Sequence, residues 1–283
     1  IAAMMLAVGY NAAEIDSVMR SLKMEKFNDG RGGLVGKVKR FSKEFGVFKG
    51  NKLDEWLSSL IAYKTNNANL SFAQLHELKL KNRKYKDLYC TGTNVSQQRI
   101  DIFSVEHTPN MLVKTAVHIS CCIPLYFEPV VIDSAYNLVQ NPEKGVRYNY
   151  YVDGGMISNY PINMFDTCVN GTNPLVCGEV KFNSQTLGLK LERKKQIDNY
   201  SENKTNVADF DIKNYKDYTF ALTNLMMETL NRRYPNLENE KGRTIYINQG
   251  NMTVKLKNIS EAEKNQMFKN GVEAVTLFFE NKK

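Results

Sequence analysis

The residues best suited to chemistry are an aspartate and the two glycines after it, Asp153, Gly154 and Gly155. Asp153 follows an apolar, aromatic run, and an Asn-Tyr-Pro turn comes shortly afterwards. A carboxylate at the tip of a strand, followed by a backbone that carries no Cβ, can approach a reacting group closely. This pattern is typical of a general base, although Asp-Gly is also a frequent turn dipeptide, and turn formation alone is the competing interpretation.

A second candidate group lies on one short segment that contains His118, Ser120, Cys121 and Cys122. His118 with either cysteine could be read as a Cys-His hydrolase, and Ser120 could be read as a nucleophile. The usual hydrolase arrangement takes the nucleophile and the base from different elements, whereas these residues share one helix. Helix packing is therefore the preferred interpretation of this segment.

Two further polar features are interpreted as structural. The glycine-rich segment 30–36 lacks the Gly-Lys-Ser/Thr ending of a phosphate-binding loop and does not follow a clear strand, so a flexible loop is expected. Asp133 and Asp166 are expected to be turn or helix-cap residues without a catalytic role.

The composition is that of an ordinary globular protein with an excess of basic residues. Of the 283 residues, 42% are hydrophobic and 24% are charged, and the formal net charge is +8. Lysine and arginine cluster in residues 79–86 and 193–195, which fits a solvated face, a nucleic-acid surface or an anionic membrane surface. No run reaches the roughly 18 apolar residues of a transmembrane helix. Residues 1–8 are too short for a signal peptide and lack its basic flank.

The cysteines have no metal-like spacing, and their number, 5, is odd. Free and mostly buried thiols are therefore expected, which favours a reducing compartment. These residues are Cys90, Cys121, Cys122, Cys168 and Cys177.

Apolar residues at helical spacing predict the helices. Ser71 is expected to cap one of them, Pro109 to open another, and Ser260 with Glu263 to form a capping box for the last. The predicted helices cover residues 1–8, 11–22, 51–62, 72–78, 109–120 and 218–232, with a last one beginning after residue 260.

Short apolar runs between these helices predict strands, and the strand over residues 148–152 delivers Asp153. Strands that alternate with helices favour an α/β layered fold, expected here as a single domain over residues 1–283. The polar and charged segment 193–215 is expected to be a loop or a partly disordered insertion. The other predicted strands cover residues 86–95, 99–103, 130–132, 186–191 and 244–247, with one more around Val176.

Several segments resemble, in order, motifs of the patatin-like phospholipases. Residues 46–57 (GVFKGNKLDEWL) are similar to the family's G-L-F-x-G-x-x-L-x-x-W-L segment. Residues 115–129 (TAVHISCCIPLYFEP) are similar to its small-residue helix, which typically reads A-x-x-A-S-x-x-I/A-P and ends in an aromatic residue and a proline. Residues 151–161 (YVDGGMISNYP) are similar to its Asp-Gly-Gly motif, and residues 243–247 to its last strand.

One motif of that family is missing. The family's nucleophile is the serine of G-x-S-x-G, on a sharp turn between a strand and a helix, and no such motif occurs in residues 1–283. Residues 1–10 nevertheless resemble the helix that directly follows this serine. The expectation is that the chain as given begins shortly after the nucleophile, without the first strand and the glycine-rich oxyanion segment. Ile1 is then expected to lie close to Asp153, with its helix under a parallel sheet.

The resemblance implies a three-layer patatin-like α/β fold with a mostly parallel central sheet flanked by helices. It implies a lipid acyl hydrolase of the phospholipase A type, in which a serine attacks an ester carbonyl and Asp153 takes its proton as a dyad without histidine. Gly154 and Gly155 would let the backbone pass close to the nucleophile turn. Burial would have to raise the pKa of Asp153 for this role. No metal and no organic cofactor is called for.

The resemblance also implies a phospholipid or another acyl lipid as substrate. It favours an anionic membrane surface over nucleic acid as the partner of the basic clusters. A cytoplasmic or membrane-peripheral location is favoured, and secretion is left open. Two alternatives remain: a catalytically inactive lipid- or membrane-binding protein of the same fold, and a basic nucleic-acid-binding protein.

Overall fold

The computed structural model describes two compact units, Ile1–Ile157 and Ser158–Lys283. Most of the helix expected over residues 218–232 and most of the glycine-rich segment 30–36 lie outside the described residues. The described residues are 1–30, 36, 41–169, 171, 173–177, 179–202, 204, 209–213, 218, 221–222, 225, 240, 242–250 and 259–280.

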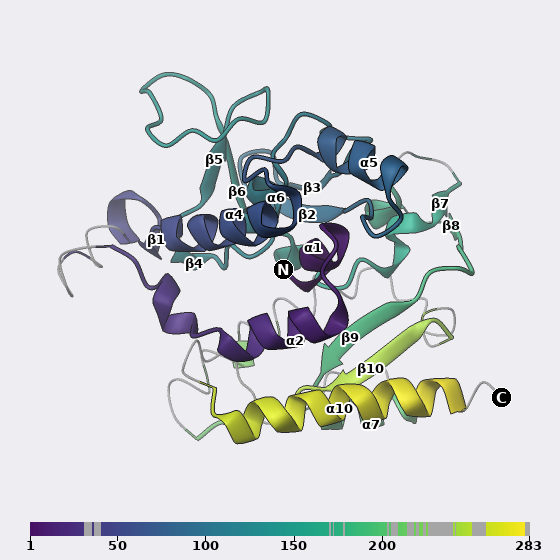
Figure 1. Cartoon of the computed structure of the whole chain (residues 1–283). Helices are drawn as coiled ribbons and strands as arrows, with labels where there is room; N and C mark the ends of the chain where they lie inside the picture. The colour runs from purple at the N-terminus through teal and green to yellow at the C-terminus, as the bar shows by residue number, and fades with distance from the viewer. Residues whose placement is uncertain are drawn as a thin grey trace. The chain divides into compact units, whose positions relative to one another are not determined.

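A four-stranded antiparallel sheet organises the first unit (Figure 1). Its strand order is β3-β2-β6-β5, so β2 and β6 lie inside the sheet and β5 lies at one edge. In the register of β2 with β6, Gly92 is the partner of Asp153. The strands are β2 (Cys90–Asn94), β3 (Arg99–Phe103), β5 (Val130–Ile132) and β6 (Asn149–Asp153).

Parallel pairing occurs in two separate ribbons. In the first unit, β1 (Gly46–Phe48) pairs with β4 (Leu125–Phe127), and in the second unit β9 (Gly188–Glu192) pairs with β10 (Thr244–Asn248). The expected α/β fold class is confirmed, whereas the sheet that carries Asp153 is antiparallel and not mostly parallel. A parallel pair needs a long crossover between its strands, and only residues 95–98 separate β2 from β3.

Helix α6 (Val113–Ile119) packs against β2 and β6, and α4 (Asn51–Thr65) packs against α6. The close approach of α6 depends on Gly92, because a Cβ built at this position would lie 2.6 Å from Cγ2 of Ile119. At Gly92, the residue that pairs with Asp153, strand β2 therefore presents only backbone atoms to α6.

The N-terminal helix α1 (Ala2–Ala7) lies in the hydrophobic core of the first unit. Met4 and Met5 are fully buried, and the carbonyl of Ala7 accepts a hydrogen bond from the N–H of Lys86. A helix of this length is not stable in isolation, and the burial of its side chains must therefore stabilise it. The expectation of an apolar helix within residues 1–8 is confirmed.

Two helices of the first unit begin at capping boxes. Asn11 caps α2 (Ala12–Ser21), and Ser71 with Gln74 caps α5 (Phe72–Lys81). In each box the cap side chain accepts a hydrogen bond from the third helical N–H, and the side chain at that position accepts one from the cap N–H. The cap expected at Ser71 is confirmed.

The helix expected to open at Pro109 begins later, at Val113. The carbonyls of Pro109 and Met111 instead accept hydrogen bonds from the N–H groups of Ala73 and Phe72, in the first turn of α5. These donors have no partner inside their own helix, so they take carbonyls that a longer α6 would have needed.

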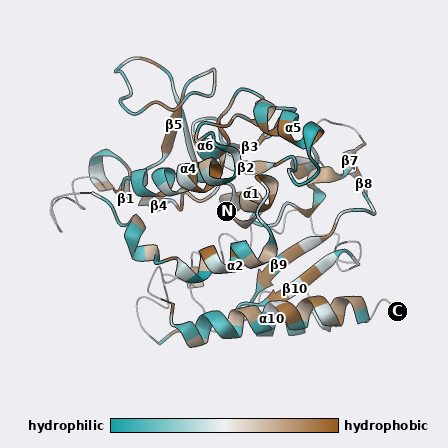
Figure 2. Ribbon diagram, viewed as in Figure 1, coloured by the Kyte–Doolittle hydropathy of each residue, from teal (hydrophilic) through white to brown (hydrophobic). Residues whose placement is uncertain are grey.

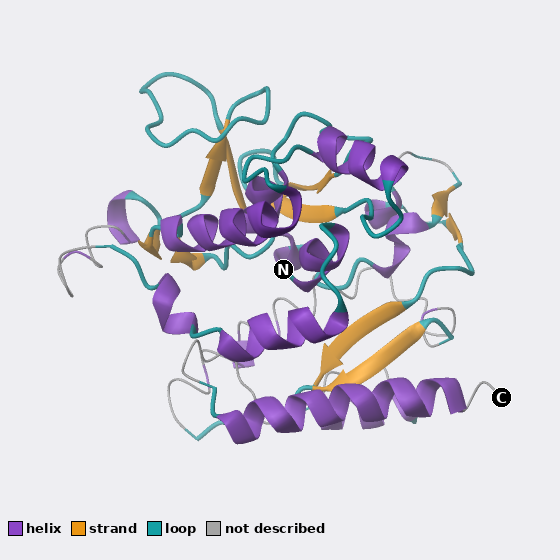
Figure 3. Cartoon of the chain, viewed as in Figure 1, coloured by secondary structure: helices purple, strands orange, loops and turns teal. Residues whose placement is uncertain are grey.

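The second unit is built on the parallel pair β9 (Gly188–Glu192) and β10 (Thr244–Asn248), with α10 (Glu261–Glu280) against β10 (Figure 3). Figure 2 shows hydrophobic residues along both strands and along the C-terminal half of α10. The capping box expected at Ser260 is confirmed, because its Oγ accepts a hydrogen bond from Glu263 N–H at 3.3 Å. The remaining elements of this unit are β7 (Thr167–Cys168), β8 (Val180–Lys181), α7 (Lys194–Ser201) and the 3-10 helices Ile162–Phe165 and Pro174–Val176; the first unit adds Met24–Phe27 and Gly154–Met156.

The strand expected around Val176 is wrong, because this segment forms a 3-10 helix. Pro174 occupies its first position, where a missing N–H costs nothing. The Oδ1 atom of Asn173 accepts a hydrogen bond from the N–H of Leu175 at 3.0 Å and caps the turn.

Part of the polar segment 193–215 is helical and not a loop. Helix α7 buries Gln196 and Tyr200, which lie four residues apart on one helical face. The buried face of α7 consists of polar and phenolic side chains, so a search for apolar residues at helical spacing does not predict this helix.

Two of the five cysteines are joined in a disulfide, Cys168–Cys177. The expectation of free thiols is therefore wrong for this pair, which the antiparallel pairing of β7 with β8 brings together. The other three cysteines, Cys90, Cys121 and Cys122, are free as expected.

Candidate active site

Asp153 is the last residue of β6, and its backbone is held on both sides. Its N–H donates to the carbonyl of Cys122 at 2.9 Å, and its carbonyl accepts a hydrogen bond from Oγ1 of Thr93 at 2.9 Å. Cys122 follows α6, whereas Thr93 lies in β2. Two elements that are distant in sequence therefore set the position of this aspartate.

The carboxylate of Asp153 turns toward its own following residues. Its Oδ1 accepts a hydrogen bond from Gly155 N–H at 2.8 Å and caps the 3-10 helix Gly154–Met156. Burial raises the pKa of Asp153 above its ordinary value, while the hydrogen bond from the N–H of Gly155 lowers it. Burial has the largest effect, and a raised pKa is what a carboxylate base requires near neutral pH.

Gly154 is confined by the neighbouring strand. A Cβ built on Gly154 would lie 2.7 Å from the Cβ of Thr91 and 2.8 Å from its carbonyl carbon, so a side chain here would meet backbone as well as side-chain atoms. The two glycines thus have separate roles: Gly154 permits close packing, and Gly155 supplies an N–H to the carboxylate.

The free thiols around Asp153 are poorly suited to be nucleophiles. Burial raises the pKa of Cys90 and of Cys122 to about 12, and it also raises the pKa of Cys121. The negative charge of Asp153 acts in the same direction on Cys121 and Cys122. Thiols of this kind stay protonated near neutral pH, so the arrangement does not favour a Cys-His hydrolase.

Ile1 is partly buried against the hydrophobic core that also contains Cys90 of β2 and Tyr151 of β6. The expected closeness of Ile1 to Asp153 stays a prediction.

The other residues that the sequence offered as candidates occupy caps, turns or packed positions and not the surroundings of Asp153. Ser120 is the C-cap of α6, and Asp133 caps a turn by accepting hydrogen bonds from the N–H groups of Ala135 and Asn137. His118 is buried and faces Asp54 on α4, with 3.9 Å between Nδ1 and Oδ1. None of the three is brought to the carboxylate of Asp153 by an interaction among the described residues.

Asp166 is the C-cap residue of the 3-10 helix Ile162–Phe165, as expected, and its side chain has a second role. Its side chain is completely buried, and its two oxygens accept hydrogen bonds from Nη1 and Nη2 of Arg243, each at 2.6 Å. The two residues belong to the second unit and are 77 positions apart. No local sequence pattern could have indicated this pair.

Within the described ranges, no group of three histidine, cysteine, aspartate or glutamate side chains is arranged to hold a metal ion. None of the helices in those same ranges has both the length and the apolar character needed to cross a bilayer.

Comparison with known proteins gives two curated viral relatives. The chain is 30% identical over 177 residues to the uncharacterized protein R571 of Acanthamoeba polyphaga mimivirus, covering 61% of this chain and 49% of that protein. It is 25% identical over 121 residues to the probable lipid hydrolase 463L of Invertebrate iridescent virus 6, covering 43% of this chain and 35% of that protein. The chain thus spans about half or less of the length of these relatives.

The fold is similar to that of a solved structure, VipD from Legionella pneumophila. The similarity covers 99% of this chain and 60% of VipD, with a TM-score of 0.50 and 15% sequence identity. At this identity the likeness concerns the fold alone.

The family model of the patatin-like phospholipases matches residues 1–166. This range is more than half of the chain, and it contains Asp153, both glycines and the segment of α6. The chain belongs to the patatin-like phospholipase family.

Proposed function

We propose that the protein is a lipid acyl hydrolase of the phospholipase A type, in which Asp153 is the general base. The observation that carries the proposal is the state of this carboxylate: it ends a strand, its backbone is fixed by Cys122 and Thr93, and burial raises its pKa. A base of this kind can take the proton of a serine hydroxyl as that oxygen attacks an ester carbonyl. The probable lipid hydrolase 463L among the relatives agrees with an acyl-lipid substrate.

In this proposal the nucleophile is a serine on a tight turn that directly precedes α1. No G-x-S-x-G motif occurs in residues 1–283, and Ile1 packs against the hydrophobic core that also contains Tyr151 of β6. A residue attached just before Ile1 would begin in the same region. The oxyanion formed on the ester would be stabilised by backbone N–H groups outside these residues.

Basic residues support binding to an anionic lipid surface. In residues 79–86, the side chains of Lys81, Arg83, Lys84 and Lys86 are exposed, and the net charge is +8. Cations near an anionic bilayer are attracted within a Debye length. We therefore propose binding to anionic vesicles in preference to DNA at physiological salt.

The test is ester hydrolysis by the full-length protein and by its Asp153→Asn variant. Loss of the base is expected to lower kcat by about 10³-fold, and replacing the serine before Ile1 by alanine is expected to have a similar effect. Asp16→Asn is the matched control, because Asp16 forms a surface ion pair with Arg20 at 2.8 Å and is expected to keep full activity. Full turnover by Asp153→Asn would refute the dyad.

A second candidate function is that of an inactive lipid-binding protein of the same fold. That protein would bind anionic vesicles yet hydrolyse no ester, and Asp153→Asn would leave its binding unchanged. The hydrolysis assay on the full-length protein separates the two functions.

A further inference from the structure

A buried polar cluster crosses the three neighbouring strands β3, β2 and β6, the last of which ends at Asp153. It consists of Asn94 of β2, Asp101 of β3 and Tyr151 of β6. Asn94 is 0% exposed and Tyr151 is 1% exposed. None of the three takes part in the proposed chemistry at Asp153, so the cluster needs an explanation of its own.

Hydrogen bonds join all three side chains. The hydroxyl of Tyr151 donates to Oδ2 of Asp101 at 2.6 Å, and Nδ2 of Asn94 donates to both of these oxygens, at 2.9 and 3.1 Å. Nε of Arg99 donates to Oδ1 of Asp101 at 2.8 Å. Burial and the Asp101 carboxylate raise the pKa of Tyr151, so its hydroxyl keeps the proton that it donates.

The sequence around β6 does not by itself determine which side chains face the core. Tyr148, Tyr150 and Tyr151 are the same residue type at even and odd positions, whereas a strand with one buried face usually alternates apolar and polar residues. A shift of the pairing by one residue would exchange Tyr150 for Tyr151 in the core. It would also turn Asp153 to the opposite face of the sheet.

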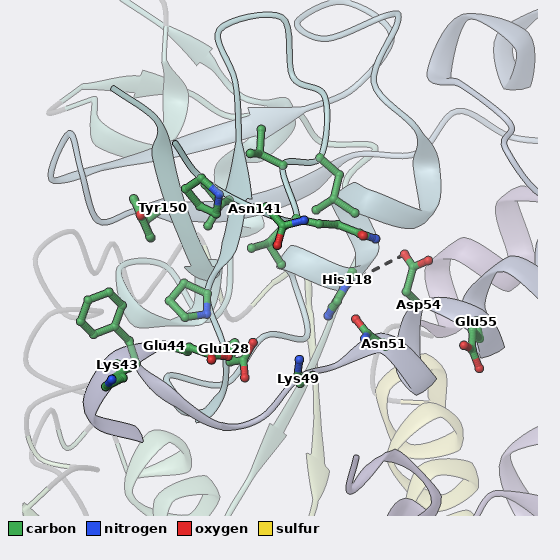
Figure 4. A pocket seen from close by; sticks show the side chains of 18 residues that line it. Lys43, Glu44, Lys49, Asn51, Asp54, Glu55, His118, Glu128, Asn141 and Tyr150 are labelled. Atoms are coloured by element: carbon green, nitrogen blue, oxygen red, sulfur yellow. Dashed lines mark ion pairs between the residues drawn. The ribbon is translucent and has the colours of Figure 1, made fainter. Parts of the chain in front are cut away.

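The two adjacent tyrosines of β6 have different surroundings. Tyr151 packs against Phe103 of β3, with 5.4 Å between the ring centroids. Tyr150 instead lines a cavity of about 800 Å³ beside β5 (Figure 4). No described side chain forms a hydrogen bond with the Tyr150 hydroxyl. The polar cluster therefore distinguishes two residues that are chemically identical.

The cluster and Asp153 lie on the same face of the sheet. Gly92 is the register partner of Asp153 on one side and of Asp101 on the other, so these three residues form one row across the strands. Asn94 and Tyr151 are partners two residues along the same strands. Because side chains alternate along a strand, this register places Asp153 on the face that contains the cluster.

Stability alone explains the cluster less well. Burying an amide and a carboxylate costs free energy that their hydrogen bonds recover only in part, so apolar side chains could stabilise this core at least as well. Hydrogen bonds with fixed partners add selectivity between alternative pairings. Selectivity matters here because β6 pairs with β2 over only three residue pairs.

We propose that Asn94, Asp101 and Tyr151 are positioning residues, whose hydrogen bonds select the register of β6 on β2 and thereby set the position of the Asp153 carboxylate. The effect on hydrolysis rests on the proposed function, whereas the effect on the strand does not. The two effects are therefore measured separately.

Hydrogen exchange of the full-length protein, followed by mass spectrometry, measures the strand. In Tyr151→Phe, which removes only the hydroxyl, the peptide over residues 149–155 is expected to exchange about tenfold faster, while the peptide over residues 72–81 keeps its rate. Tyr150→Phe makes the same chemical change one residue away and is the matched control, with parent-like exchange in both peptides. Unchanged exchange over residues 149–155 in Tyr151→Phe would overturn the proposal, and so would an equal increase in both peptides.

Ester hydrolysis measures the consequence for Asp153. Tyr151→Phe is expected to lower kcat about tenfold with KM changed less than about twofold, because a displaced base slows the chemical step and leaves substrate binding intact. Tyr150→Phe is expected to keep both constants. Parent-like kcat in Tyr151→Phe would overturn the positioning of Asp153. Full turnover by Asp153→Asn would instead refute the base and leave the exchange result standing.

Asp101→Asn is a second, milder variant in case Tyr151→Phe does not fold. It keeps the shape of the side chain and one oxygen for the Tyr151 hydroxyl, but its amide group faces the donors of Asn94 or Arg99. Exchange over residues 149–155 is expected to be about threefold faster, and kcat about threefold lower. Parent-like values in Asp101→Asn, together with an unfolded Tyr151→Phe, would assign the cluster to stability alone and overturn the proposal.

Discussion

Oγ1 of Thr91 occupies the space in which a side chain on Gly154 would begin, since a Cβ built on that glycine would lie 2.2 Å from this oxygen. Thr91 lies in β2 and Gly154 follows directly on β6, so the contact joins the residue after the candidate base to the neighbouring strand. Both the carbonyl carbon and the side chain of Thr91 lie within 3 Å of that Cβ position, so a rotation of the Thr91 side chain alone could not make room for it.

Gly154→Ala is expected to lower the free energy of unfolding by about 1–3 kcal/mol, since one of the two strands must move to admit the methyl group. The same shift displaces Asp153, so lipid hydrolysis by the full-length protein is expected to fall as well. Urea denaturation followed by circular dichroism measures the stability change. In Gly271→Ala, the control in α10, the added Cβ meets nothing within 4 Å, and a gain of up to about 1 kcal/mol is expected. Parent-like stability and activity in Gly154→Ala would show that the strands can separate at no cost.

The pKa of Asp153 predicts a pH-dependent stability. Burial raises this pKa in the folded state, so the folded protein holds the proton more tightly than the unfolded chain does. Stability contributed by the group is then present below the unfolded pKa and is lost as pH rises through the folded pKa. Asp153→Asn, which cannot ionise, is expected to be more stable than the parent at pH 7 and no more stable at strongly acid pH. Denaturation curves at both pH values check this, and a less stable variant at pH 7 would contradict it.

The buried pair Asp166–Arg243 is expected to be essential to the second unit. Asp166→Asn leaves the guanidinium buried without its counter-charge, at an expected cost of about 3–5 kcal/mol. The control is Lys194→Gln, which breaks an exposed ion pair with Asp198 and is expected to cost less than about 1 kcal/mol. Chemical denaturation of both variants provides the comparison. Equal losses in the free energy of unfolding would mean that the buried pair contributes no more to stability than the exposed pair does.

The disulfide predicts the outcome of thiol labelling. Under denaturing, non-reducing conditions, iodoacetamide is expected to modify only three of the five cysteines, Cys90, Cys121 and Cys122. Reduction of Cys168–Cys177, whose separation is 9 residues, is expected to cost about 2–3 kcal/mol from the lost restriction on the unfolded chain. Mass spectrometry of the labelled peptides and denaturation with and without reductant measure the two effects. Five labelled cysteines in unreduced protein would show that the bond is absent.

Features that depend on neighbouring residues could be predicted from the sequence. The caps at Ser71 and Ser260 are confirmed because their partners lie three positions away. The strand before Asp153 was indicated by its apolar and aromatic residues, and the fold class followed from family motifs. Asp153 as the base and the two glycines as its support stay predictions.

Features that depend on distant residues could not be predicted. Asp166–Arg243 and the approach of His118 to Asp54 join positions that only the complete fold brings together. The bond Cys168–Cys177 is local, but no pattern in the sequence marks these two among the five cysteines. Local competition explains the late start of α6, since its expected first carbonyls are used by α5. The helix α7 was missed because its buried face consists of polar and phenolic groups.

The hydrogen bond from the Asp153 N–H to the carbonyl of Cys122 ties this aspartate to the segment that leaves α6. Fraying of that short helix would release the aspartate while the rest of the sheet is still paired. If the proposed hydrolysis depends on Asp153, mild heating or low denaturant is expected to abolish ester hydrolysis by the full-length protein before its circular dichroism changes, so that inactivation and global melting follow separate curves.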